Sequence, residues 1–189
     1  MTPLLEAALE LQNFLSARGW QFCTIGGIAL LRWGEPRFTR DVDVTLLAGF
    51  GREDEFIDPF LSSGYRGRIP DVAGFARRNR VLLLDSPLGI PIDIALGGLP
   101  FEALVVERAS LYEFEPGCAL LTCSAEDLIV QKLFAFRTRD VSDVETVVIR
   151  QRGRLDWPYL ETHLAPLAEL KEQPEIMAVF SELRRKLAR

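Results

Sequence analysis

Residues 41–47 read Asp-Val-Asp-Val-Thr-Leu-Leu, and this stretch decides the fold. Side chains alternate between the two faces of a strand, so Asp41 and Asp43 share one face while the valines share the other. Two carboxylates at positions i and i+2 suit a divalent cation, because Mg²⁺ takes one or two protein carboxylates and completes its shell with water and phosphate oxygens. Alternating acids and valines are equally typical of a solvated strand, so the pair needs support from its surroundings.

Features on both sides of this strand favour a metal site. Upstream, Gly26 and Gly27 lie between an apolar run and a short helix, where backbone amides without side chains can approach a triphosphate and the helix dipole favours anions. Downstream, Asp93 lies inside a second β-rich run. A third carboxylate on a neighbouring strand completes a two-metal site, whose ions lie ~3.5–4 Å apart and serve the attacking and leaving oxygens of an in-line displacement. We therefore expect a metal site at Asp41, Asp43 and Asp93.

The rest of the chain predicts an α+β protein with a mixed sheet flanked by helices. A Ser-Pro-Leu-Gly turn at 86–89 and a Pro-Gly turn at 116–117 predict two hairpins. We expect a catalytic core over residues 1–123 and a C-terminal helical lobe over 124–189, packed on the core as one compact unit. The periodicity predicts helices at 2–17, 28–33, 55–61, 124–136, 141–150, 157–169 and 174–187, and strands at 20–25, 41–47, 81–85, 90–96, 109–114 and 119–122.

Composition bounds the function. The chain has 189 residues, 48% of them hydrophobic, and a net charge of −5, which disfavours a broad, non-specific grip on nucleic acid. Its three cysteines lack CxxC spacing, as is typical of a reducing compartment. No secretory leader and no apolar run of ~20 residues is present in the sequence, so we expect a cytoplasmic protein without a membrane segment. The one histidine, His163, has no nucleophile or acid at suggestive spacing, which disfavours Ser-His-Asp and Cys-His catalysis.

A lysine in an apolar stripe is the second candidate site. Lys132 falls among Leu128, Leu133 and their apolar neighbours on a predicted helix, and a buried ammonium needs an anion. A phosphate is one candidate partner; the alternatives are a side chain that reaches solvent or an ion pair with a nearby acid. The nearby acids are Glu126, Asp140 and Asp143.

Two further groups of residues are candidates. Asp140 and Asp143 begin the next predicted helix, where acids complement the helix dipole; this explains Asp140 and leaves Asp143 as a site candidate. Arg37, Thr39 and Arg40 immediately precede the acidic pair, so an arginine there can reach triphosphate oxygens and Thr39 can hold the loop. Surface solvation explains Arg40 equally well. The most basic stretch either meets an RNA end or forms a solvated loop; it contains Arg66, Arg68, Arg77, Arg78 and Arg80.

The order glycine pair, Asp-x-Asp strand and later acidic strand resembles the nucleotidyltransferase superfamily with the polymerase-beta-like fold. Three segments are similar to the AbiEii-type toxin branch: 26–30 (GGIAL), 37–43 (RFTRDVD) and 132–143 (KLFAFRTRDVSD). The resemblance implies two Mg²⁺ ions, or Mn²⁺ in their place, on the three aspartates. It also implies a set of nucleotide-binding residues: Gly26, Gly27, Arg37, Thr39, Arg40, Lys132 and an acid after the lysine, which is Asp140 or Asp143.

This resemblance implies transfer of a nucleoside monophosphate from an NTP to an acceptor hydroxyl, with pyrophosphate leaving. The implied acceptor is a tRNA 3′ end or a protein hydroxyl, and the toxin-like branch implies a cognate antitoxin. Two alternatives share the fold. One is an enzyme that modifies aminoglycoside or lincosamide antibiotics, and the other is a non-catalytic binding module.

Overall fold

The computed structural model describes residues 1–187 and divides into two compact units. Unit 1 contains residues 1–28 and 38–123, and unit 2 contains residues 29–37 and the chain from 124 onward. Residues 29–37 fall within the core predicted over residues 1–123. They group with the second unit because helix 138–150 holds them: the Thr146 hydroxyl accepts from the Glu35 amide, and Arg150 and Gln151 donate to the carbonyls of Gly34 and Trp33.

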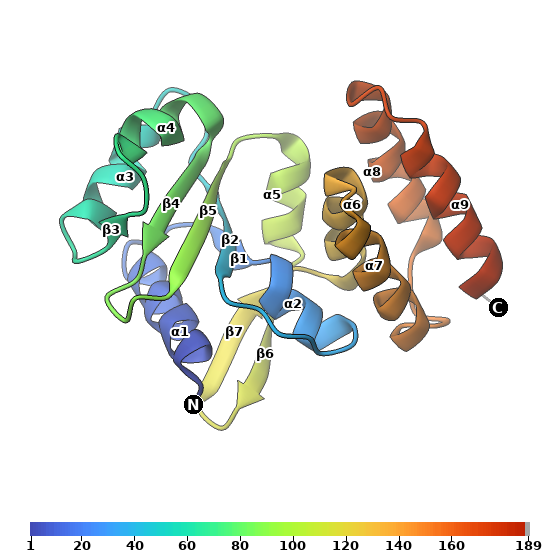
Figure 1. Cartoon of the computed structure of the whole chain (residues 1–189), viewed down its shortest axis with the longest axis horizontal. Coiled ribbons are helices and arrows are strands. Elements are labelled where there is room, and N and C mark those ends of the chain that lie inside the picture. Colours follow the sequence, from blue (N-terminus) through green and yellow to red (C-terminus); the bar gives the residue numbers. More distant parts are fainter. Residues whose placement is uncertain (188–189) are drawn as a thin grey trace. The chain divides into compact units, whose positions relative to one another are not determined.

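Unit 1 is built on a mixed, seven-stranded sheet with the strand order β3-β4-β5-β2-β1-β7-β6 (Figure 1). Strand β2 is parallel to β5 and antiparallel to β1, while β1 is parallel to β7. The elements of this unit are α1 (Pro3–Ser16), β1 (Phe22–Thr24), β2 (Val42–Leu47), α3 (Glu53–Leu61), β3 (Arg66–Gly67), α4 (Val72–Asn79), β4 (Val81–Asp85), β5 (Pro91–Gly97), α5 (Pro100–Glu107), β6 (Ser110–Glu115) and β7 (Cys118–Thr122).

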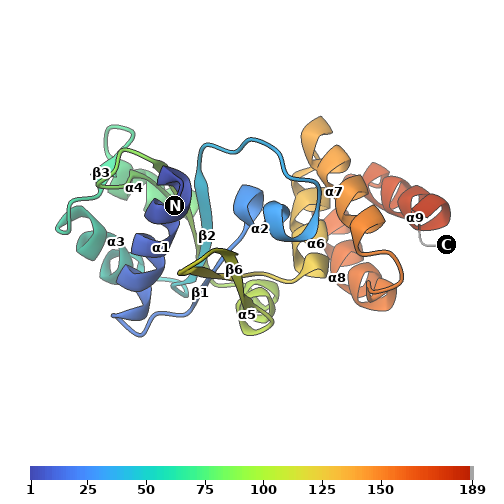
Figure 2. The same cartoon turned by 90° about the horizontal axis from the view of Figure 1, so that it is seen from below.

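The two faces of the sheet have different roles. Every second residue of β2, β4 and β5 is buried in one apolar core with residues of α1, α3 and α4, and these helices cover that face (Figure 2). The residues between them, Asp43 and Asp93 included, point to the opposite face, as the strand period of two requires. The core therefore fixes the side on which the acidic residues appear.

Most predicted elements are confirmed, and the differences have local causes. Helix α2 (Gly26–Trp33) begins at Gly26 rather than after a glycine turn, and β2 begins one residue after Asp41. Helix α4 was missed in the arginine-rich stretch, although the Asp71 side chain caps it by accepting from the Gly74 amide. Helix α5 was missed too, although Pro100 is a favourable first residue and Glu102 accepts from the amides preceding the helix.

Unit 2 is helical from residue 124 onward, with α6 (Ala125–Ala135), α7 (Thr138–Arg150), α8 (Trp157–Leu170) and α9 (Glu175–Leu187). The predicted cap at Ser124 is confirmed, since its hydroxyl accepts from the Asp127 amide. Asp127 is fully buried, and its carboxylate accepts from the Tyr159 hydroxyl at 2.5 Å and from Ser124 at 2.6 Å. No helix within residues 1–187 combines the length and apolar character needed to cross a membrane.

An aromatic cluster anchors α1 and α3 to the core. Phe60 is fully buried, and its ring centroid lies 4.7 Å from that of Phe14, 5.2 Å from Tyr65 and 5.9 Å from Trp20. These rings come from α1, α3 and the segments that follow each helix. Burial of large aromatic rings dominates core energetics, so we expect the packing of Phe60 to hold α1 and α3 together.

Truncating Phe60 tests this packing. Phe60→Ala removes a fully buried ring, and we expect the free energy of unfolding to fall by about 3–5 kcal/mol. The neighbouring Leu61, 39% exposed, is the matched control, and Leu61→Ala should cost about 1 kcal/mol or less. Urea unfolding followed by circular dichroism measures both values, and equal losses would contradict the assigned role of Phe60.

Candidate functional site

The acidic strands β2 and β5 are hydrogen-bonded neighbours, and their register places Asp43 directly beside Asp93. In a parallel pair the strands lie about 4.8 Å apart and paired residues point to the same face. Asp41 precedes β2 by one residue, and its charge is near enough to raise the pKa of Asp93. The three carboxylates predicted from sequence therefore gather at one side of the sheet in unit 1.

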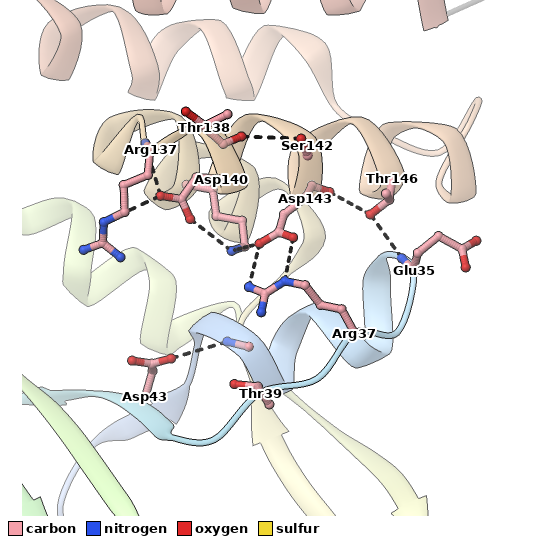
Figure 3. Close-up of polar contacts among 12 residues, drawn as sticks. Glu35, Arg37, Thr39, Asp43, Arg137, Thr138, Asp140, Ser142, Asp143 and Thr146 are labelled. Atoms are coloured by element: carbon pink, nitrogen blue, oxygen red, sulfur yellow. Dashed lines mark hydrogen bonds and ion pairs between the residues drawn. The ribbon is translucent and has the colours of Figure 1, made fainter.

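Each of these carboxylates accepts a hydrogen bond from a protein group. The Thr39 hydroxyl donates to Asp41 at 2.9 Å. The backbone amide of Gly27 donates to Asp43 at 3.4 Å, and Figure 3 shows this bond at Asp43. The Arg68 guanidinium pairs with Asp93. Thr39 was expected to hold the loop by a bond from its side chain to the backbone; the bond present is instead to the Asp41 side chain.

The glycine pair makes room for this arrangement. A Cβ atom on Gly26 would lie 1.9 Å from Oδ2 of Asp43, and one on Gly27 would lie 2.3 Å from Oγ1 of Thr39. Gly26 also has a φ of +59°, in the left-handed region that favours glycine. Both glycines are therefore required by the side chains of the acidic strand and its loop, in addition to any contact with a nucleotide.

The environment raises the pKa of the Asp93 carboxyl above its usual value. Burial is the main cause; the Arg68 charge opposes it, and the Asp41 charge reinforces it. A carboxylate that is partly desolvated beside another acid is held as an anion by a nearby cation. In this structure Arg68 supplies that positive charge.

The chemistry of these side chains fits Mg²⁺ or Mn²⁺, which prefer carboxylate oxygens. As their side chains stand, however, no three Asp, Glu, His or Cys residues within the described part of the chain are placed to hold a metal ion together. In this structure each of the three carboxylates is directed to a protein donor. Asp41, Asp43 and Asp93 are the residues that would hold the ion.

A second group of predicted residues comes together in unit 2, around Asp143 of α7. The Arg37 guanidinium donates two hydrogen bonds to the Asp143 carboxylate, at 2.7 and 2.8 Å (Figure 3). The Lys132 ammonium lies 2.6 Å from Asp143 and 3.4 Å from Asp140. Burial raises the pKa of Asp143, but the hydrogen bonds from Arg37 and Lys132 outweigh it and hold that pKa below its usual range.

Lys132 pairs with acids in this structure, which is one of its alternatives, and its contact with a nucleotide phosphate stays a prediction. Its burial on the apolar stripe of α6 is confirmed, and its partners in this structure are Asp143 and Asp140. Asp140 also accepts from the Arg137 amide at the start of α7, as expected of an acid at a helix N-terminus. Asp143, which both cations contact, is the acid placed to act with them.

Four arginines of the arginine-rich stretch are paired with acids of the same chain. Arg77 pairs with Asp54, Arg78 with Asp71, and Arg80 with Glu53. Arg40 is exposed, and its guanidinium lies 5.3 Å from the ring centroid of the exposed Phe38. The contact of Arg68 with Asp93 was missed, since they lie 25 residues apart and only strand pairing brings them together.

Residues 21–154 match the family described as "Nucleotidyl transferase AbiEii toxin, Type IV TA system". No curated protein matches the chain. Among solved structures, an antigenic nucleotidyltransferase-like protein from Paracoccidioides brasiliensis has a TM-score of 0.54 and 17% identity, over 95% of this chain and 92% of that one. The antibiotic-resistance factor ANT(2'')-Ia has a TM-score of 0.57 and 15% identity, over 90% and 95%.

The lincosamide antibiotic adenylyltransferase LnuA is also similar, with a TM-score of 0.51 and 13% identity, over 75% of this chain and 94% of that one. At these identities the likeness is one of fold. It confirms the expected α+β fold of the polymerase-beta-like type, with its mixed sheet.

Substituting Gly26 tests the close approach to Asp43. Gly26→Ala places a methyl group against the Asp43 carboxylate at a positive φ. Gly49→Ala is the control, since Gly49 has a φ of +67° and an added Cβ atom there would meet nothing within 4 Å. We expect Gly26→Ala to lower the free energy of unfolding by about 1–3 kcal/mol more than Gly49→Ala. Chemical denaturation checks this, and equal losses would rule out the steric role.

The lowered pKa of Asp143 gives a pH-dependent contribution to stability. Its charged form is favoured in the folded state, so this contribution is complete above the ordinary carboxyl pKa of about 3.9 and is lost as pH falls toward the lower folded-state pKa. Asp143→Asn should destabilise the protein at pH 6 and make its stability less dependent on pH below about 4. Urea unfolding from pH 6 to pH 3 checks this; an unchanged slope would contradict it.

Proposed function

The chain belongs to the AbiEii nucleotidyl transferase toxins of type IV toxin–antitoxin systems, and we propose that it transfers a nucleoside monophosphate from an NTP to an acceptor hydroxyl. Pyrophosphate would leave in this reaction. The observation that supports the proposal best is the register of Asp43 with Asp93, with Asp41 near and a glycine-led helix beside them. A sheet end with three carboxylates is suited to metal-assisted phosphoryl chemistry.

The protein residues have separable roles in this proposal. Asp41, Asp43 and Asp93 would hold Mg²⁺, which when bound neutralises phosphate charge and activates the acceptor hydroxyl. The amides at Gly26 and Gly27 start α2, where its dipole favours the triphosphate. Because burial raises the pKa of Asp93, this carboxylate is also suited to accept the proton of the hydroxyl.

Lys132, Arg37 and Asp143 form the nucleotide-binding group of the proposal. Arg37 and Lys132 share the buried carboxylate of Asp143, and Lys132 also lies 3.4 Å from Asp140, so both cations are held in place. Fixed cations of this kind bind phosphate without reorganisation. We propose that Lys132 and Arg37 contact the triphosphate while Asp143 orients them, and that Thr39 and Arg40 also bind the nucleotide.

For the acceptor we propose a hydroxyl of a cellular macromolecule, either a tRNA 3′ end or a protein side chain, because a toxin acts on a component of the cell. The toxin–antitoxin family also implies a cognate antitoxin. The small-molecule acceptors of the antibiotic-modifying structures belong to those proteins, whose likeness to this chain is one of fold.

Replacing one carboxylate tests the reaction. Asp43→Asn keeps the shape of the side chain and its contact with Gly27 but removes the charge, so we expect label transfer from each α-³²P-labelled NTP into cell extract to fall by at least ~100-fold. The thermal midpoint should stay within about 2 °C of the wild-type value. Asp54→Asn, which alters an exposed acid on α3, is the control and should retain full transfer.

The labelled product identifies the acceptor. Nuclease-sensitive label indicates RNA, and protease-sensitive label indicates a protein hydroxyl. Undiminished transfer by Asp43→Asn would refute the metal assignment, and label confined to small molecules would refute the macromolecular acceptor.

A further inference from the structure

We propose that Arg68 is a built-in counter-ion for Asp93, which must leave this carboxylate before a divalent cation can bind there. This inference rests on the proposed metal-dependent reaction and adds a regulatory step to it. Arg68 would compete with the metal for the same carboxylate oxygens, so it would lower the affinity for the free cation and suppress metal binding in the resting protein.

The position of Arg68 is fixed by the sheet. Its backbone amide donates to the carbonyl of Leu83 at 3.1 Å, and Leu83 is the register partner of Asp93 on β4. The main chain of Arg68 thus lies one strand away from the acidic residue. From this anchor its guanidinium reaches Asp93, so strand pairing brings the two residues within reach of each other.

Arg68 differs from the other arginines of its stretch. Arg77, Arg78 and Arg80 pair with Asp54, Asp71 and Glu53. These three acids lie outside the acidic strands. Arg68 is directed instead to a carboxylate at the proposed metal site, although the exposed fractions of the paired side chains, 28% and 35%, leave both within reach of solvent. A cation from solution can therefore reach the pair.

The surroundings of Asp93 explain why it attracts a counter-ion. The carboxylate is partly desolvated, it lies beside Asp43 on the neighbouring strand, and the charge of Asp41 acts on it. Three acids in one region repel one another unless a cation is present. A guanidinium supplies this charge in the resting protein, and a divalent cation would supply more of it to all three.

The site should therefore bind a cation already complexed with a nucleotide more readily than a free cation. A free cation must displace Arg68 without compensation. A cation bound to a triphosphate brings anionic oxygens to which the released guanidinium can donate, because arginine pairs with phosphate as readily as with carboxylate. The loss of one ion pair is then offset by the gain of another.

Manganese binding to the nucleotide-free protein tests this inference directly. Titration of Mn²⁺, followed by its electron paramagnetic resonance signal, should show about tenfold tighter binding to Arg68→Gln than to wild type. Arg77→Gln removes the same formal charge from an arginine that pairs with Asp54 and should stay within about twofold of wild type. Arg68→Lys keeps the positive charge and should also resemble wild type.

A double-variant cycle localises the effect to the pair. In the Asp93→Asn background Mn²⁺ should bind more weakly, and adding Arg68→Gln should change the affinity by less than about twofold. Equal affinities of Arg68→Gln and Arg77→Gln, with binding still lost in Asp43→Asn, would overturn the counter-ion role and leave the proposed metal site intact. Absence of Mn²⁺ binding from both wild type and Arg68→Gln would overturn both.

Discussion

The parallel pairing of β2 with β5 is the constraint on which the rest of the site depends. Their apolar residues, such as Val44 and Ile94, are buried against the helices on one face. Since the strand period is two, burying these residues turns Asp43 and Asp93 together to the opposite face. A slip of one residue would bury the acids, so the hydrophobic core enforces the register that the proposed reaction needs.

The glycines that open α2 are a second level of the same constraint. Their sequence pattern predicts backbone amides that a triphosphate can approach. The structure adds a steric requirement from within the protein, because a Cβ atom on Gly26 would overlap the Asp43 side chain and one on Gly27 would overlap the Thr39 side chain. The start of α2 can therefore pack against β2 and the loop before it only because its first two residues are glycines. At Gly26 the positive φ is a second reason, since a residue with a Cβ atom would be strained there.

Sequence patterns predicted the fold well wherever periodicity and turn chemistry agreed. The acidic strand, both hairpins and the C-terminal helices followed from alternation, from turn residues and from caps such as Ser124. Helix α4 was missed because its arginines indicated a charged loop, and β3 because two residues carry no period. The order and strand face of the three aspartates predicted that Asp43 and Asp93 lie side by side, whereas the contact of Arg68 with Asp93 depends on pairing between strands distant in sequence.

The intramolecular pairing of arginines also bears on how quickly a partner can arrive. Four arginines of this stretch each lie against an acid of the same chain: Arg68, Arg77, Arg78 and Arg80. The electrostatic field of each arginine is therefore largely cancelled by its partner. The chain as a whole carries a net charge of −5. Long-range attraction would therefore contribute little to the encounter with a polyanion. Recognition of such an acceptor would depend on short-range fit, with association that is slow and only weakly sensitive to ionic strength.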